Sequence, residues 1–271
     1  MNCKKNANRN PGEERQLFHP ESEKVVEIGL ERLRPFKNHP FKVKEDEAMA
    51  QLMESIERYG IMNPLIVMPT REGVYQIVSG HRRKYCAEKL GYTQVPVIIR
   101  YMKEDDSIIS MVDSNLHRDK ILFSEKAFAY YMKNEAMKRK TGKRRRTQEG
   151  QLKSIKGTKT IQLIGKETGE SPRQVLRYIR LILLVPELLD MLDEGKISFN
   201  PAVELSFLSE VEQKWVLNGM DYAQATPSVS QAKRIKALSQ EKMLTQQKVN
   251  EILSEIKKSD MSRVIFKNSQ M

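Results

Sequence analysis

The chain has 271 residues, enough for one large domain or two to three small domains with buried cores. Lysine and arginine number 47 against 35 aspartates and glutamates, and the net charge of +12 favours polyanions as partners. The two cysteines, Cys3 and Cys86, exclude a disulfide framework and a cysteine-rich zinc site. Because there is no signal peptide and no apolar run of about 18 residues, we expect a cytoplasmic protein that does not enter a membrane.

The first part of the chain predicts a tail followed by a small α/β domain. Residues 1–23 are polar and show no hydrophobic period, which is typical of a disordered tail. Residues 24–104 are expected to form the domain, with a first strand beginning at Val25. Its further elements are a helix over 45–59, a hairpin of strands over 64–68 and 74–78, a helix over 81–90 and a strand over 95–100. Together they predict a small mixed sheet flanked by helices.

The stretch Ser79-Gly-His-Arg-Arg83 joins the second hairpin strand to the following helix. Arg82 and Arg83 lie in the first turn of that helix, where the helix dipole makes a cation unfavourable by about 0.3–1 kcal/mol. Unpaired backbone N–H groups and two arginines at one helix start favour a pocket for an anion, most often phosphate. The alternative is a strand-to-helix turn with two solvated arginines.

From residue 105 onward, the pattern predicts helix after helix. Residues 105–137 are expected to form two linking helices, with Asp106 and Ser124 as their N-caps. Residues 138–159 form a basic loop rich in glycine, lysine and serine, which is either a solvated linker or a contact to a phosphate backbone. The residues of this loop that we expect to contact DNA are Lys143, Arg144, Arg145 and Arg146.

Residues 160–225 predict a helix-turn-helix domain. A short helix ends at Gly169, and Ser171-Pro172 supplies an N-cap and a proline at the first position of the next helix. That second helix has one apolar face and one basic face, as does a recognition helix in the major groove. The alternative is a helical hairpin with a basic exposed face. The DNA-contacting residues expected here are Ser171, Arg173, Gln174, Arg177 and Arg180.

The remaining segment predicts further helices. Asn200-Pro201 is expected to start one helix, and Ser209 with Glu212 forms a capping box for the next. Trp215 is expected in the core. Residues 226–271 are expected to form a C-terminal helical segment. This segment either serves dimerisation or packs on the preceding domain.

The order of these parts resembles the ParB family of partition proteins. The stretch PLIV…YQIVSGHRRKYCAEKLGYTQVPVII is similar to the family's N-terminal domain, and IGKETGESPRQVLRYIRL…VPELLDMLDEGKIS is similar to its central DNA-binding domain. The resemblance covers about residues 25–210 and is nearest in character to the plasmid or mobile-element type. It implies an α+β fold class: a mixed-sheet ParB/sulfiredoxin-like N-terminal domain, then an all-helical helix-turn-helix domain and a C-terminal helical segment.

The same resemblance implies a function and a nucleotide site. It implies a site-specific DNA-binding partition protein that acts as a CTP-responsive sliding clamp. In the family, a G-x-R-R motif and an E-N-x-x-R motif hold the triphosphate of CTP with Mg²⁺. The matching nucleotide-binding residues in this sequence are Ser79, Gly80, His81, Arg82, Arg83, Ser114, Asn115 and Arg118.

Two positions depart from the family motifs, because His81 and Ser114 stand where the family has glutamate. A neutral imidazole and a hydroxyl do not replace carboxylates as ligands of a hard cation. We therefore assign no catalytic residue and no metal ligand, and expect at most a slow CTPase. The implied partners are double-stranded DNA with a palindromic site, a second copy of the chain and a possible partner ATPase, in a cytoplasmic protein associated with the nucleoid.

Two other function classes remain as alternatives. A helix-turn-helix transcription regulator would bind DNA without any response to nucleotide. A sulfiredoxin-like or nuclease enzyme is disfavoured, because Cys86 lies within a helix and Asp105-Asp106 is explained as a helix start. The four histidines also lack the spacing of a metal site.

Overall fold

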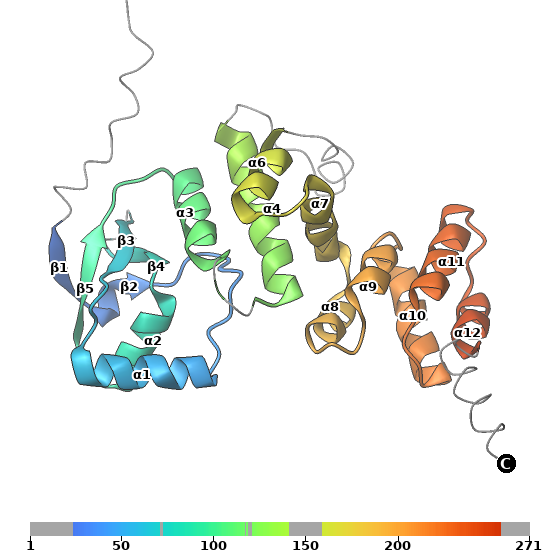
Figure 1. Cartoon of the computed structure of the whole chain (residues 1–271), viewed down its shortest axis with the longest axis horizontal. Helices are drawn as coiled ribbons and strands as arrows, with labels where there is room; N and C mark the ends of the chain where they lie inside the picture. The colour runs from blue at the N-terminus through green and yellow to red at the C-terminus, as the bar shows by residue number, and fades with distance from the viewer. Residues whose placement is uncertain (1–23, 71–72, 117, 119–120, 141–158, 256–271) are drawn as a thin grey trace, which may run out of the picture. The chain divides into compact units, whose positions relative to one another are not determined.

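The computed structural model describes residues 24–70, 73–116, 118, 121–140 and 159–255 (Figure 1). They belong to two compact units, one holding residues up to 37 and 43–102, the other holding 38–42 and the chain from 103. The predicted disordered tail, the greater part of the predicted basic loop and the last residues, 256–271, lie outside the described residues.

The first unit is built on a mixed sheet of five strands in the order β1-β5-β3-β4-β2. The hairpin of β3 and β4 is antiparallel as predicted, whereas β3 and β5 are parallel. The short β2, which the sequence pattern did not predict, pairs in parallel with β4. The strands are β1 (Val25–Gly29), β2 (Leu33–Arg34), β3 (Leu65–Pro69), β4 (Tyr75–Ser79) and β5 (Gln94–Ile99). The prediction of a mixed sheet is confirmed.

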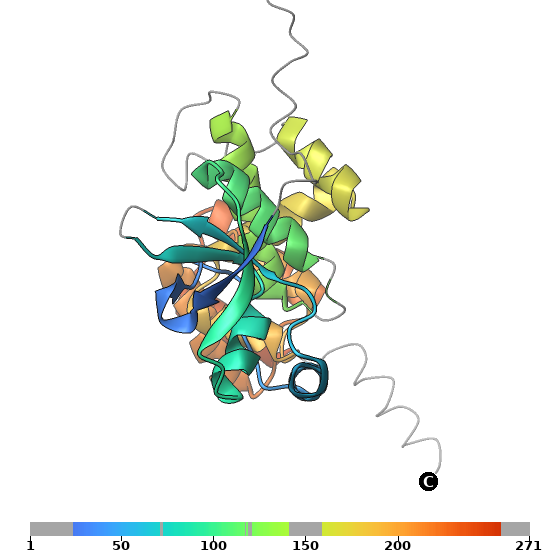
Figure 2. The same ribbon diagram turned by 90° about the vertical axis from the view of Figure 1, so that its left-hand side faces the viewer.

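Two helices of the first unit, α1 (Glu47–Tyr59) and α2 (His81–Lys89), pack side by side (Figures 1 and 2). The Asp46 side chain accepts a hydrogen bond from the Met49 backbone N–H at 2.8 Å and so begins α1, which ends at Gly60 as predicted. Cys86 is fully buried between the helices with Met49, and burial raises the pKa of its thiol. Both observations agree with the argument that Cys86 does not serve as a reactive thiol.

In the described part of the second unit, the regular elements are all helices (Figure 1). Its helices are α3 (Glu104–Leu116), α4 (Phe123–Lys140), α6 (Lys159–Thr168), α7 (Pro172–Arg180), α8 (Pro186–Asp193), α9 (Phe199–Leu205), α10 (Glu210–Ala223), α11 (Val229–Gln240) and α12 (Gln246–Ser254). A 3₁₀ turn over Leu181–Leu183 follows α7. A mixed-sheet unit followed by helices confirms the α+β fold class.

Some helix boundaries differ from those predicted. The helix α4 begins at Phe123, so Ser124 is not its N-cap; instead the Ser124 backbone N–H donates to Asp193 at 3.0 Å, and its hydroxyl also donates to that carboxylate. A partner on α8, distant in sequence, therefore replaces the local capping interaction. Asp106 likewise lies inside α3, which begins at Glu104. Since α4 extends to Lys140, the first part of the predicted basic loop is helical.

Residues 38–42 belong with the helical unit, although the chain on both sides of them belongs to the sheet unit. Phe41 is only 2% exposed, and the Arg118 guanidinium lies 5.5 Å from the centre of its ring. The Lys42 backbone N–H donates to Oε1 of Glu125 at 2.8 Å. The polypeptide therefore passes from one unit to the other at 37, 42 and 102.

The C-terminal helices share one core with the middle of the second unit. The helix α11 packs on α9, and α12 packs on α10. Trp215 is partly buried against this core, as expected. Packing on the preceding helices is thus observed for the described part of the C-terminal segment, and dimerisation stays a prediction. Among the helices described, none is long and apolar enough to cross a membrane.

The helices α6 and α7 meet across a tight turn. Ile161, Ile164, Val175 and Ile179 are buried together against α4. Gly165 lies where this contact is closest, because a Cβ atom there would lie 2.5 Å from the Glu170 carbonyl oxygen. Only a residue without a side chain fits this position without moving the turn.

We expect Gly165→Ala to lower the free energy of unfolding by about 1–3 kcal/mol, because the added methyl group forces the turn away from α6. Chemical denaturation followed by circular dichroism measures this difference. The control is Gln162→Ala on the exposed side of the same helix, where a change within about 0.5 kcal/mol is expected. Equal unfolding midpoints for both variants would show that the turn tolerates a side chain.

Candidate functional site

The start of α2 has the geometry of an anion site. Gly80 joins β4 to α2 with φ 109° and ψ 19°, and a Cβ atom there would lie 2.7 Å from Cγ of Leu65. Both features require glycine. No side chain caps this helix, so its first backbone N–H groups receive no side-chain acceptor. Such a helix start attracts an anion.

Arg82 has a donor that the fold does not use. Its terminal Nη2 lies 3.3 Å from Oδ1 of Asp46, the carboxylate that also caps α1. Its Nε atom is buried and has no hydrogen-bond partner. A buried N–H without an acceptor costs about 1–3 kcal/mol, more at a charged group. Arg82, in the first turn of α2, therefore keeps one donor without an acceptor in the described structure.

The neighbouring Arg83 is engaged by the fold itself. Its Nη1 donates to the carbonyl oxygens of Asn63 and Pro64, the latter at 2.9 Å. Burial lowers the pKa of its guanidinium. Arg83 therefore holds the chain that leads into β3, which sets it apart from Arg82.

His81 and Ser79 flank Gly80. The Nε2 atom of His81 accepts a hydrogen bond from the Phe36 backbone N–H at 3.2 Å, so this nitrogen carries no proton in the described geometry. The imidazole thus ties the start of α2 to the segment after β2. Ser79 is half-buried at the end of β4.

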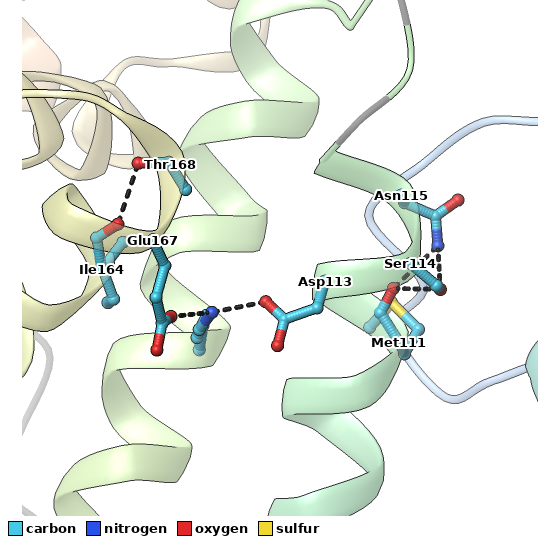
Figure 3. Close-up of polar contacts among 8 residues, drawn as sticks. Met111, Asp113, Ser114, Asn115, Ile164, Glu167 and Thr168 are labelled. Carbon is cyan, nitrogen blue, oxygen red and sulfur yellow. Dashed lines mark hydrogen bonds and ion pairs between the residues drawn. The ribbon is translucent and has the colours of Figure 1, made fainter.

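The second motif lies at the end of α3, in the helical unit. Asn115 is 4% exposed, and its Nδ2 donates to the Met111 carbonyl oxygen at 2.8 Å (Figure 3). The exposed Ser114 donates to the same oxygen at 2.9 Å. Arg118 follows, with its guanidinium over Phe41. The predicted nucleotide residues are therefore divided between the two units, with residues 79–83 on one and the second motif on the other.

The residue types fit the triphosphate better than the metal ion. Arg82 and the start of α2 offer donors to phosphate oxygens. For Mg²⁺, the predicted set offers only cationic arginines and neutral groups, and the Ser114 hydroxyl already donates within α3. Mg²⁺ in nucleotide sites is usually held by carboxylates together with phosphates. These residues therefore provide no carboxylate for Mg²⁺.

The candidate DNA interface is the exposed side of α7. The Ser171 hydroxyl accepts a hydrogen bond from the Gln174 backbone N–H at 3.1 Å, which confirms the predicted N-cap. Arg173 is exposed and Gln174 is half-exposed at the start of the helix. Their positions in the first turn are those from which a recognition helix reaches base edges.

Arg177 is held by Gln174 and by two residues that the sequence did not single out for binding, Phe199 and Asn200. Its Nη1 donates to Gln174 Oε1 at 3.1 Å, and its Nη2 donates to Oδ1 of Asn200. The guanidinium also lies 4.8 Å from the centre of the Phe199 ring. Asn200 was predicted only as a helix start, but α9 begins at Phe199 with Ser198 as N-cap, which leaves the exposed Asn200 side chain beside α7. Nothing in the sequence around Asn200 indicated that its side chain would contact Arg177.

Arg180 makes contacts within the fold. Its Nη2 donates to the Ser206 carbonyl oxygen at 3.2 Å, and its guanidinium lies 3.4 Å from the centre of the Phe207 ring. Burial lowers the pKa of this group. The predicted DNA contacts Lys143, Arg144, Arg145 and Arg146 lie outside the described residues.

Comparison with known proteins finds similarity to chromosome-partitioning and nucleoid occlusion proteins. Residues 14–116 match the family model of the ParB N-terminal domain. The stage 0 sporulation protein J of Bacillus subtilis (strain 168) is 31% identical over 176 residues, which cover 65% of this chain and 55% of that protein. The nucleoid occlusion protein of Lysinibacillus sphaericus (strain C3-41) is 26% identical over 155 residues, 55% of this chain and 52% of that protein.

A solved structure also resembles this chain. It is the C-terminally truncated chromosome-partitioning protein ParB from Caulobacter crescentus complexed to the centromeric parS site. It is 21% identical, with a TM-score of 0.44, and the match covers 80% of this chain and 99% of that one. A TM-score of this size does not establish a common fold over the whole length. The chain spans about half the length of the curated relatives first matched, 52% and 56%.

Proposed function

The chain carries a ParB N-terminal domain, and from this premise we propose that it is a site-specific DNA-binding protein of the ParB type. The observation that carries the proposal is the helix-turn-helix that follows this domain in the same chain, with Arg173 and Arg177 on the outer side of its second helix. Arginine at these positions binds guanine edges or phosphates. The net charge of +12 adds the long-range attraction that DNA binding needs.

We further propose that the start of α2 binds the triphosphate of CTP. The unpartnered Nε of Arg82 and the uncapped helix start at Gly80 support an anion site there. The resemblance of the two motifs to those of ParB proteins supports CTP as the anion. Because His81 and Ser114 replace glutamates, we propose that CTP is sensed and at most slowly hydrolysed.

The proposal extends to the oligomeric state of the protein and its role in the cell. A ParB-type protein with a palindromic site binds it as a homodimer, because two-fold DNA symmetry calls for two-fold protein symmetry. We propose that this dimer acts as a CTP-responsive sliding clamp in DNA segregation or nucleoid occlusion, associated with the nucleoid. A role on a plasmid or mobile element and a partner ATPase belong to the same proposal.

One experiment separates this function from its alternatives. The purified full chain is mixed with each of the four nucleoside triphosphates, with and without duplex DNA selected from random sequence, and nucleotide binding and phosphate release are measured. The proposal expects sequence-specific DNA binding, with CTP bound in preference to the other three. Specific DNA binding without any nucleotide binding would instead identify a transcription regulator. Absence of sequence-specific DNA binding would contradict the proposed function.

A further inference from the structure

The ammonium group of Lys133 joins three helices of the second unit. Lys133 lies on α4, and its side chain is 2% exposed. Its Nζ donates to Oδ1 of Asp113 on α3 and, at 2.5 Å, to Oε2 of Glu167 on α6 (Figure 3). The helix α6 is the first helix of the helix-turn-helix. One buried cation therefore links α3 to the DNA-binding helices.

Asp113, the partner of Lys133 on α3, directly precedes the second nucleotide motif, which begins at Ser114. Asp113 points from α3 toward Lys133, whereas Ser114 and Asn115 point to the other side of the helix (Figure 3). A shift of the Ser114 side of α3 is therefore also a shift of the Asp113 carboxylate. Because a helix moves as a rigid element, the two sides cannot change position independently.

The buried charge of Lys133 depends on its two partners, whereas neither carboxylate depends on the lysine to the same degree. The side chains of Asp113 and Glu167 are 46% and 52% exposed, so water can solvate either carboxylate when it leaves the lysine. Lys133 has no such exposure, and a buried charge that loses its partners is strongly destabilised. Loss of one carboxylate leaves Lys133 with the other, whereas loss of both leaves it unpaired.

The surroundings leave room for one carboxylate to leave. A cavity of about 350 Å³ is bordered by both acids, and by Lys126, Tyr130 and Thr168. Lys126, one of the lining residues, forms an ion pair with Glu170 in the turn between α6 and α7. Two separate sets of ion pairs, those of Lys133 and Lys126 on α4, therefore reach α6 and the turn that precedes α7.

We propose that Lys133 is a positioning residue that makes the placement of α3 depend on the placement of α6. DNA bound at α7 restrains α6. Glu167 on α6 then holds Lys133 in the position from which the lysine also contacts Asp113. The second motif on α3 is thereby held more firmly when DNA is bound. This inference rests on the proposed binding of DNA by α7.

A matched control is available on the same helix. Arg139 of α4 forms an ion pair with Asp105 of α3 at 2.6 Å. Arg139→Gln removes an ionic contact between α3 and α4 without touching either partner of Lys133. Lys133→Met is a volume-matched change that leaves no buried charge behind, and such replacements often preserve stability.

Hydrogen exchange of backbone amides in the full chain, with and without a duplex selected from random sequence, tests the proposal. In the parent protein and in Arg139→Gln, we expect DNA to slow exchange in α6 and α7 and also, by about fivefold or more, at residues 113–116 of α3. In Lys133→Met, DNA still slows exchange in α6 and α7, and the effect on α3 is lost. A merely structural role would raise exchange equally with and without DNA, which would overturn the proposal.

Two further outcomes keep the inference distinct from the proposed function. If DNA slows exchange in α6 and α7 of the parent but not in α3, DNA binding stands and the role of Lys133 is refuted. If DNA binds nowhere, the proposed function itself fails. Should Lys133→Met not fold, the pair Asp113→Asn and Glu167→Gln replaces it. Because either change breaks the link between α3 and α6, each alone must remove the effect of DNA on α3 exchange, and an effect that survives one of them would overturn the proposal.

Discussion

Replacing Arg177 by alanine is expected to weaken binding to the selected DNA site by about 1–3 kcal/mol, the range measured for a lost base or phosphate contact. The side chain is prepared for this role, because Gln174, Asn200 and Phe199 all hold its guanidinium in place. A side chain that is already ordered loses little conformational entropy on binding. Fluorescence anisotropy with the selected duplex, over a series of salt concentrations, measures both the affinity and its salt dependence.

The control for this change is Arg180→Ala, three residues further along α7. Because the Arg180 guanidinium packs on Phe207 and donates to Ser206, we expect its loss to lower thermal stability more than DNA affinity. Asn200→Ala should weaken DNA binding in part, through a less ordered Arg177. If Arg177→Ala left both the affinity and its salt dependence unchanged, α7 would not be the recognition helix.

Replacing Arg82 by alanine is expected to abolish measurable CTP binding while DNA recognition in the absence of nucleotide remains close to that of the parent. A charge-assisted hydrogen bond contributes about 1.5–3 kcal/mol, and the Arg82 guanidinium has an Nε donor without a partner. Isothermal titration calorimetry with CTP measures the loss. Equal CTP affinity in the variant and the parent would remove Arg82 from the site.

Asp46→Asn gives a test of opposite sign at the same place. Asparagine is as good an N-cap as aspartate, so α1 keeps its first hydrogen bond. The change removes the negative charge that lies beside Arg82 and would repel a phosphate. We expect CTP affinity to rise, whereas Arg83→Ala should chiefly lower stability, because two carbonyl oxygens lose their donor.

Features set by neighbours in sequence could be predicted from the sequence. Gly80 and Ser171 are examples: a turn into a helix needs a residue that tolerates positive φ, and a helix start needs a side-chain acceptor for its N–H groups. The antiparallel pairing of β3 and β4 followed from a turn between two apolar runs. In each case the physical cause lies within a few residues of its effect.

Features set by distant residues could not be predicted in this way. Ser124 resembles an N-cap, yet Asp193, 69 residues away, takes its hydrogen bonds. The contact of Asn200 with Arg177 and the bridge by Lys133 join helices whose relative placement no local pattern encodes. The difference between Arg82 and Arg83, adjacent in sequence, likewise depends on which carbonyl oxygens lie nearby.

The crossing of residues 38–42 into the helical unit limits how the chain can be recombined with its relatives. A fragment that ends at residue 102 would carry Phe41 without Arg118, which lies over its ring, and a fragment that begins at 103 would leave Glu125 without the Lys42 amide. Exchange of the sheet unit between homologous proteins therefore fails as a single cut-and-join at 102. A working chimaera has to keep residues 38–42 from the same parent as α4.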